Sequence, residues 1–258
     1  MTGQRPSGSG TPALWFNPPD DGPAGRRALT RERVVAEALA IIGADGAQSL
    51  SMRALAARLG VVPGALYRHV RGKEQLYDLI LDAVLGEVDC RADPAASWAA
   101  QITALAHRLR AVLENHPGVA ALLKTRDPLS PASLELAEAF LAPLLASGLP
   151  GRDAALAFRL IYDYTLGFAL ADPTSPAEQR LHDTATREQL HAFFRSLPAD
   201  GFPALTAYGS YAWDGDRDQR FTVGLETLLR GIEANRRLPG AEPADRLPIR
   251  GQDEIRPT

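Results

Sequence analysis

The sequence predicts an all-α protein in which a three-helix N-terminal domain, containing a helix-turn-helix, precedes a larger helical domain. Three observations favour this fold class. Apolar residues recur with helical spacing through most segments, no alternating pattern of useful length occurs, and Gly and Pro fall where helices should end or begin. The 258 residues, 45% hydrophobic and 23% charged, have an ordinary globular composition with room for one or two domains.

The first helix should begin after Thr30 and run to about Gly43, because threonine is a favourable N-cap residue. Its apolar positions form one broad face that would support the next helices from behind. These positions are Val34, Val35, Ala38, Leu39, Ile41 and Ile42.

A tight helix pair should follow in residues 49–70, which read SLSMRALAARLGVVPGALYRHV. Ser51 is a good N-cap, and apolar residues at i, i+3, i+4 and i+7 give the first helix of the pair one buried stripe. Gly60 stands where a helix C-terminus favours a left-handed residue, and Pro63 suits the first turn of a second helix. The order of helix, glycine turn and helix is the helix-turn-helix pattern.

The second helix of the pair should turn Leu66 and Val70 inward and leave Gly64 on its outer side. A small residue there permits close approach, and long polar side chains could reach phosphates or base edges in a major groove. The polar residues concerned are Tyr67, Arg68, His69, Arg71 and Lys73. The alternative is a helical hairpin inside an ordinary all-α domain, with Tyr67 and His69 covering its core.

Charge is distributed unevenly around this pair. The whole chain has a net charge of −3, but residues 26–73 contain nine Lys or Arg against three acids, which leaves −9 for the remainder. A basic head and an acidic remainder favour contact with DNA through the head.

Several absences narrow the possible classes of protein. The chain has no apolar run long enough for a membrane span and no signal peptide, so we expect a cytoplasmic protein. Its single cysteine, Cys90, excludes an internal disulfide and a cysteine-rich metal site. No nucleotide-binding loop, metal-ligand spacing or serine nucleophile motif is present, although an enzyme built on His182 or His191 with Asp183 or Asp163 stays open.

The remaining segments should be helical. After Gly72, a longer helix should run from Lys73 to about Val88, with Leu76, Leu79, Ile80, Ala83 and Val84 inward. Further helices are predicted over residues 97–115, 119–124, 130–147, 152–171, 186–197 and 218–235, and an irregular Gly/Pro-rich stretch should precede Asp216.

Residues 28–90 resemble the DNA-binding domain of TetR-family transcriptional repressors, through LYRHVRGKEQL preceded by MRALAARLGV. The resemblance implies a repressor that binds a near-palindromic operator and is released by a small-molecule effector, with Lys73 contacting a phosphate. It places the DNA-binding residues at Thr30, Arg53, Gly64, Ala65, Tyr67, Arg68, His69 and Lys73. Activation in place of repression stays open.

The segments YTLGFAL and FTVGLETLLRGIEA resemble the C-terminal domain of the tetracycline-repressor branch, whose last two helices form a four-helix dimer bundle. Both helices are apolar on more than one face, as a homodimer would require. The expected organisation is a disordered arm over 1–28, a DNA-binding domain with its linker helix over 29–90, an effector-binding and dimerisation domain over 91–236, and a flexible tail over 237–258. In the arm, Trp15 and Phe16 could instead dock on the body, or Arg26 and Arg27 could touch a minor groove.

The effector site is predicted only from aromatic or polar residues on segments that should face the body's interior. These are Trp98, His116, Thr125, Phe158, Tyr162, Thr165 and Phe168, each of which could be a core residue instead. Asp89 and Leu122 stand where the resemblance places the tetracycline repressors' drug and magnesium histidines, so we expect neither that ligand nor any metal or cofactor. A body that binds a protein partner is the remaining alternative.

Overall fold

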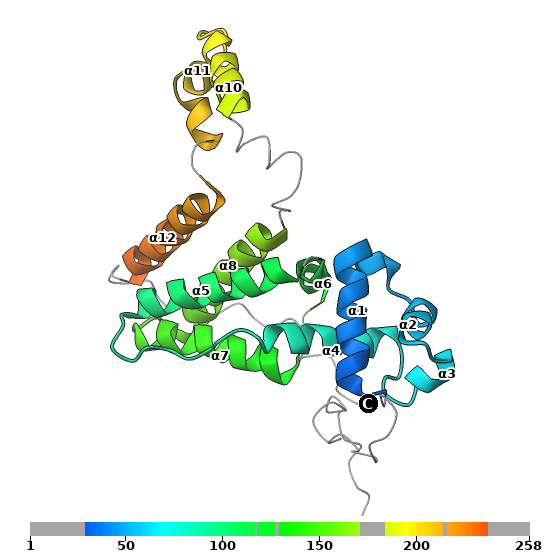
Figure 1. The fold of residues 1–258 in the computed structure, drawn as a ribbon. Helices are drawn as coiled ribbons and strands as arrows, with labels where there is room; N and C mark the ends of the chain where they lie inside the picture. Colours follow the sequence, from blue (N-terminus) through cyan, green and yellow to red (C-terminus); the bar gives the residue numbers. More distant parts are fainter. Residues whose placement is uncertain (1–28, 117, 127–128, 171–183, 214–215, 237–258) are drawn as a thin grey trace, which may run out of the picture. The chain divides into compact units, whose positions relative to one another are not determined.

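A computed structural model describes residues 29–116, 118–126, 129–170, 184–213 and 216–236, and these ranges contain helices and no strand (Figure 1). The predicted arm, the tail and the segment 171–183 lie outside the described residues. The chain divides into two compact units. One comprises the chain up to Glu87 and again from His116 to Leu134, and the other comprises Val88–Asn115 and the chain from Glu135 onward.

The first unit contains the predicted N-terminal helices together with a short helix from later in the chain. Its elements are α1 (Arg31–Asp45), η2 (Ala47–Ser49), α2 (Met52–Leu59), α3 (Pro63–Leu66), α4 (Lys73–Leu85) and α6 (Val119–Thr125). The Thr30 hydroxyl caps α1 by accepting a hydrogen bond from the Arg33 N–H at 3.2 Å. Of the predicted α1 face, Leu39 is only partly buried and the other members are buried.

The α2–α3 pair forms as its sequence predicts. The Ser51 hydroxyl accepts a hydrogen bond from the Ala54 N–H at 3.1 Å, and Gly60 ends α2 in the left-handed region at φ 69°. Glycine is suited to that conformation because a Cβ atom would be strained there. Leu66 and Val70 are both buried, so α3 and its following turn are anchored from the inside.

Two boundaries differ from the prediction. Regular helix in α3 ends at Leu66, and a turn in which the His69 and Val70 N–H groups both donate to the Leu66 carbonyl continues it. The helix α4 ends at Leu85 instead of Val88, and the Gly86 N–H closes it on the Asp82 carbonyl. The predicted inward position of Ala83 is wrong, since its side chain is exposed.

The second unit is built on α5 (Trp98–Asn115), α8 (Gly151–Leu170) and α12 (Arg217–Arg236), which pack on one another. It also contains most of α7 (Pro131–Ala146) and a hairpin of α10 (Thr184–Ser196), α11 (Pro203–Tyr208) and η3 (Gly209–Trp213). Helix α12 lies very close to α8, because a Cβ atom on Gly224 would collide with the Tyr164 phenol. That phenol donates to the Phe221 carbonyl at 2.9 Å.

The prediction of an irregular stretch before Asp216 is wrong, because α11 and η3 occupy it. Proline is compatible with the first turn of a helix, and Pro203 begins α11 in this way. None of the helices in the described ranges is long and apolar enough to cross a membrane.

Candidate nucleic-acid interface and ligand grooves

The surface of α3 and its following turn exposes the predicted contact residues. Tyr67 is 55% exposed, and Gly64 and Arg68 are also exposed. His69 is partly buried. Ala65 differs from the prediction, because its side chain is buried with Leu66 and cannot lie on the outward face.

The other predicted DNA contacts lie in the same unit. Arg53 is exposed on α2, and neither it nor Arg68 forms an ion pair with any residue that the structure describes. Thr30 is exposed, but its hydroxyl is occupied as the α1 cap. Lys73 is the first residue of α4, and its ammonium lies 5.3 Å from the centre of the Tyr77 ring. These cations can reach phosphates without first breaking an ion pair.

The first turns of α4 are tied to the end of α6. Arg126 forms ion pairs with Glu74 and with Asp78, the second at 3.2 Å, and its guanidinium lies 4.9 Å from the centre of the Tyr77 ring. Burial raises the pKa of Asp78 above its ordinary value. The first turn of α4, where the predicted DNA contact Lys73 lies, is therefore fixed to α6 within the first unit.

The predicted effector residues are divided between the two units. His116 and Thr125 belong to the first unit, whereas the other five belong to the second. The His116 Nε2 atom lies 2.9 Å from a Glu87 carboxylate oxygen, and the Thr125 hydroxyl donates to a carbonyl of its own helix, that of Leu122. Both groups therefore have structural partners.

Three predicted effector residues on α8 also have core contacts. The ring of Phe158 lies 5.8 Å from Phe140 and 5.9 Å from Tyr162, measured between ring centres. Thr165 is fully buried, and its hydroxyl donates to the Ile161 carbonyl one turn earlier. Helical spacing placed these side chains on one face, where Phe158 contacts neighbouring rings and the Thr165 hydroxyl bonds its own helix.

Phe168, which is partly buried, packs against two aromatic rings. Its ring centre lies 5.1 Å from that of Tyr164 and 5.2 Å from that of Phe221. Four of the five predicted effector residues in the second unit are therefore at least partly engaged by neighbours.

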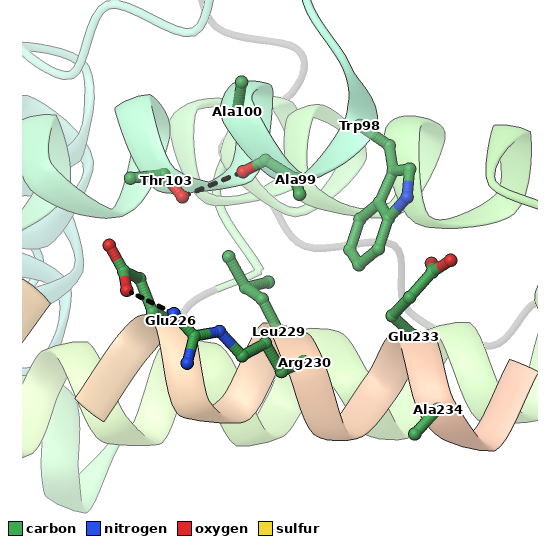
Figure 2. A pocket seen from close by; sticks show the side chains of 9 residues that line it. All are labelled: Trp98, Ala99, Ala100, Thr103, Glu226, Leu229, Arg230, Glu233 and Ala234. Atoms are coloured by element: carbon green, nitrogen blue, oxygen red, sulfur yellow. Dashed lines mark hydrogen bonds and ion pairs between the residues drawn. The ribbon is translucent and has the colours of Figure 1, made fainter. Parts of the chain in front are cut away.

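Trp98, another predicted effector residue, lines a groove in the described part of the chain. Figure 2 shows its indole projecting from the start of α5 toward α12, beside Leu229 and Glu233. This groove, which we call the Trp98 groove, has a volume of about 610 Å³. Its other lining residues are Ala99, Ala100, Thr103, Glu226, Arg230 and Ala234. The apolar floor and charged rim suit an organic molecule with an apolar ring system.

Trp98 also borders a second groove of about 460 Å³ between the 90–101 segment and α7. Its α7 wall is made of small residues, Ala139, Ala142 and Ala146. Sequence reasoning missed this groove, although alanines at helical spacing on one face were the available signal.

Sequence reasoning also missed a buried ionic cluster between α5 and α12. Arg110 is 4% exposed, and it bonds Glu114 at 2.8 Å and Asp218 at 2.5 Å. Arg217 is also buried and lies 3.2 Å from Glu114. Burial of the His107 ring, together with the Arg110 charge, lowers the pKa of His107. Arg110 falls within an otherwise apolar helical stripe, which was the signal for it.

Part of the second unit's surface is apolar. Leu156 and Leu160 on α8 are 59% and 48% exposed, and Val223 on α12 is 56% exposed. The two leucines border a groove of about 530 Å³ that also includes Ile232 of α12. Among the described residues, no group of three or more His, Cys, Asp or Glu side chains could hold a metal ion.

Comparison with known proteins covers both parts of the chain. The family model described as "Bacterial regulatory proteins, tetR family" matches residues 34–80, and that described as "Tetracyclin repressor-like, C-terminal domain" matches residues 92–236. An HTH-type transcriptional regulator of Saccharopolyspora erythraea is 34% identical over 223 residues, covering 86% of this chain and 92% of the relative.

Two other similarities have comparable extent. The HTH-type transcriptional repressor DrrR1 of Streptomyces coeruleorubidus is 32% identical, with 83% of this chain and 80% of that protein covered. The crystal structure of the TetR family protein ActR of Streptomyces coelicolor, in complex with actinorhodin, superposes with a TM-score of 0.72 at 32% identity. That match covers 81% of this chain and 97% of ActR.

Proposed function

The chain belongs to the TetR family of bacterial regulatory proteins, and we propose that it is a cytoplasmic repressor that binds a near-palindromic operator as a homodimer. A small-molecule effector releases it. The observation that carries the proposal is the outward face of α3, where exposed Tyr67 and Arg68 stand over buried Leu66 and Val70 in a basic segment. The family is one of regulators, and no catalytic role is proposed.

In the proposed complex, α3 enters the major groove and residues 29–90 form the DNA-binding head. Lys73 and Tyr67 bind phosphates, and Arg53 and His69 supply further contacts. Arg68 reads a base edge, most simply guanine, through its two-pronged guanidinium. Two heads about 34 Å apart in a dimer would then read two half-sites.

Dimerisation is supported by the apolar surface of α8 and α12. Exposed Leu156, Leu160 and Val223 would lose contact with water when a second copy packs on them. Residues 91–236 therefore form the dimerisation and effector domain in this proposal.

The Trp98 groove is the proposed effector site. A bound molecule would favour a dimer whose heads no longer match adjacent grooves, and it can shift that balance only by its differential affinity for the two states. We propose that magnesium–tetracycline is not the effector, because Asp89 is paired with Arg91 at 2.8 Å and Leu122 is buried. A saturable thermal stabilisation by tetracycline with magnesium would contradict this.

The DNA-binding proposal is tested by fluorescence anisotropy, using a duplex selected from a randomised library and a random duplex. Tyr67→Ala should weaken binding to both duplexes by a similar factor, and the wild-type affinity should fall steeply with salt. Arg68→Ala should cost roughly 1–3 kcal/mol on the selected duplex and little on the random one. Equal losses on both duplexes for Arg68→Ala would remove its role in base reading.

The effector proposal is tested with a chain in which Trp15 and Trp213 are replaced by Phe, so that Trp98 is the only tryptophan. Any compound that releases this chain from the selected duplex should also change the Trp98 emission with the same concentration dependence. A compound that releases DNA while Trp98 emission stays constant would place the effector elsewhere.

A further inference from the structure

The turn between α2 and α3 exposes an apolar side chain at the start of the helix that Tyr67 ends. Val62 is 72% exposed, the largest exposed fraction among the large apolar side chains described in the chain. Pro63 beside it is also exposed. Neither side chain can form a hydrogen bond, so this part of the surface can recognise a partner only by apolar contact.

Val62 is held in one conformation. Its backbone is extended at φ −72° and ψ 144°, and its carbonyl accepts a hydrogen bond from the Ala65 N–H at 2.9 Å. A β-branched side chain on a fixed backbone has few rotamers, so little entropy is lost when it makes a contact. The exposed methyl groups are therefore preorganised.

Gly64 supplies a second, independent observation. A Cβ atom built on Gly64 would meet nothing within 4 Å, and its φ is not in the left-handed region. Neither packing within the described chain nor backbone conformation requires glycine here, although glycine in a helix costs roughly 1 kcal/mol relative to alanine. A partner that approaches the α3 backbone closely from outside would explain it.

The chemistry of the major groove narrows what Val62 could meet. Three of the four bases present only hydrogen-bonding groups along the groove edge, whereas thymine adds a C5-methyl group. A thymine methyl is therefore the one apolar partner that a bare valine side chain can select. Tyr67 and Arg68, at the other end of α3, supply the hydrogen bonds.

From this geometry we infer that Val62 reads the C5-methyl group of one thymine in each operator half-site, and that Gly64 permits the approach. This inference rests on the proposed docking of α3 in the major groove. Val62 at the α2–α3 turn would then make the apolar contact with DNA, and the residues after Leu66 would make the polar contacts. Val62 is thus a specificity-determining residue that the sequence pattern did not indicate.

The experiment replaces each thymine of the selected duplex in turn by deoxyuridine, which removes the methyl group and keeps the base pair. One thymine in each half-site should be sensitive. Substituting it in a single half-site should weaken wild-type binding about fourfold, the effect of leaving one methyl-sized group unburied. Substitution in both half-sites together should cost roughly fifteenfold if the sites act independently. Val62→Ala should cause a similar loss on the thymine duplex.

The two changes should not be additive. If Val62 contacts the methyl group, deoxyuridine at that position should cause almost no further loss of DNA affinity in Val62→Ala. The matched control is Leu129→Ala, which loses another exposed apolar side chain of the first unit and should respond to deoxyuridine as wild type does. Equal deoxyuridine losses in wild type and Val62→Ala would indicate altered DNA stiffness and overturn the inference. The absence of any sensitive thymine would also overturn it, whereas failure of the wild type to prefer the selected duplex would overturn the proposed function itself.

Discussion

The two compact units differ in whether they bury charged side chains. In residues 29–87 every buried side chain is apolar or aromatic, and the functional candidates Tyr67 and Arg68 stand outside. In the second unit Arg110 and Arg217 are buried, while Leu160 is half exposed. The comparison indicates that the first unit presents its chemistry to a partner from a conventional core. The second unit buries two arginines and exposes apolar side chains on α8 and α12.

The largest effect should come from the buried ionic cluster. Arg110→Ala should lower the free energy of unfolding by about 3 kcal/mol, because the buried guanidinium bonds Glu114 and lies 4.8 Å from the centre of the Phe221 ring, and both interactions are lost. The matched control is Arg230→Ala, whose pair with Glu226 is exposed and should contribute less than about 1 kcal/mol. Urea unfolding measures both. Similar costs for the two variants would mean that the buried cluster has no special structural role.

The next effect concerns the apolar surface. Leu160→Glu should raise the dimer dissociation constant roughly 100-fold, since two copies each place a charge in the interface. Leu145 on α7 has the same exposed fraction, 48%, so Leu145→Glu is the matched control and should leave the dimer intact. Analytical ultracentrifugation distinguishes them. Dimers of undiminished strength in Leu160→Glu would place the interface elsewhere.

The sequence predicted the first unit better than the second. Ser51, Gly60 and Pro63 act through neighbours a few residues away, so local rules predicted the α2–α3 pair. Whether Phe158 or Thr165 borders a cavity depends on residues from other helices, which helical spacing alone does not reveal.

The ionic cluster was missed for the same physical reason. Arg110 and Asp218 are 108 positions apart, and their pairing depends on how α5 and α12 pack. Val62 was missed because an exposed valine in a turn has no pattern in the sequence; its significance comes from its exposure at the start of α3.

A smaller effect should come from the loss of one helix N-cap in each unit. Ser51→Ala and Ser97→Ala each remove a hydroxyl that accepts a hydrogen bond from a backbone N–H in a first helical turn, and each should cost about 1 kcal/mol of stability. Only Ser51→Ala should also weaken binding to the selected duplex, because it loosens the helix that supports α3. Anisotropy titrations of both variants decide this. Equal DNA affinities would mean that α2 does not hold the recognition surface.

The smallest effect is a pH dependence in the second unit. The pKa of His107 is lowered in the folded state, so the unfolded chain binds a proton first as pH falls below the ordinary histidine value of about 6.5. Stability should therefore decline from about pH 6.5 down to the folded-state pKa. His107→Gln should remove that part of the decline and behave as wild type in this respect above pH 7.5. Identical pH profiles down to pH 5 would contradict the linkage.

The most direct test of the account is the ratio of wild-type affinities for the selected duplex and for random DNA of equal length, measured by anisotropy at physiological salt. We expect a near-palindromic selected sequence, one dimer per duplex and a ratio of at least about 10³. A ratio near one, with Tyr67→Ala binding as well as wild type, would contradict it. The exposed surface of α3 would then have no role in reading DNA.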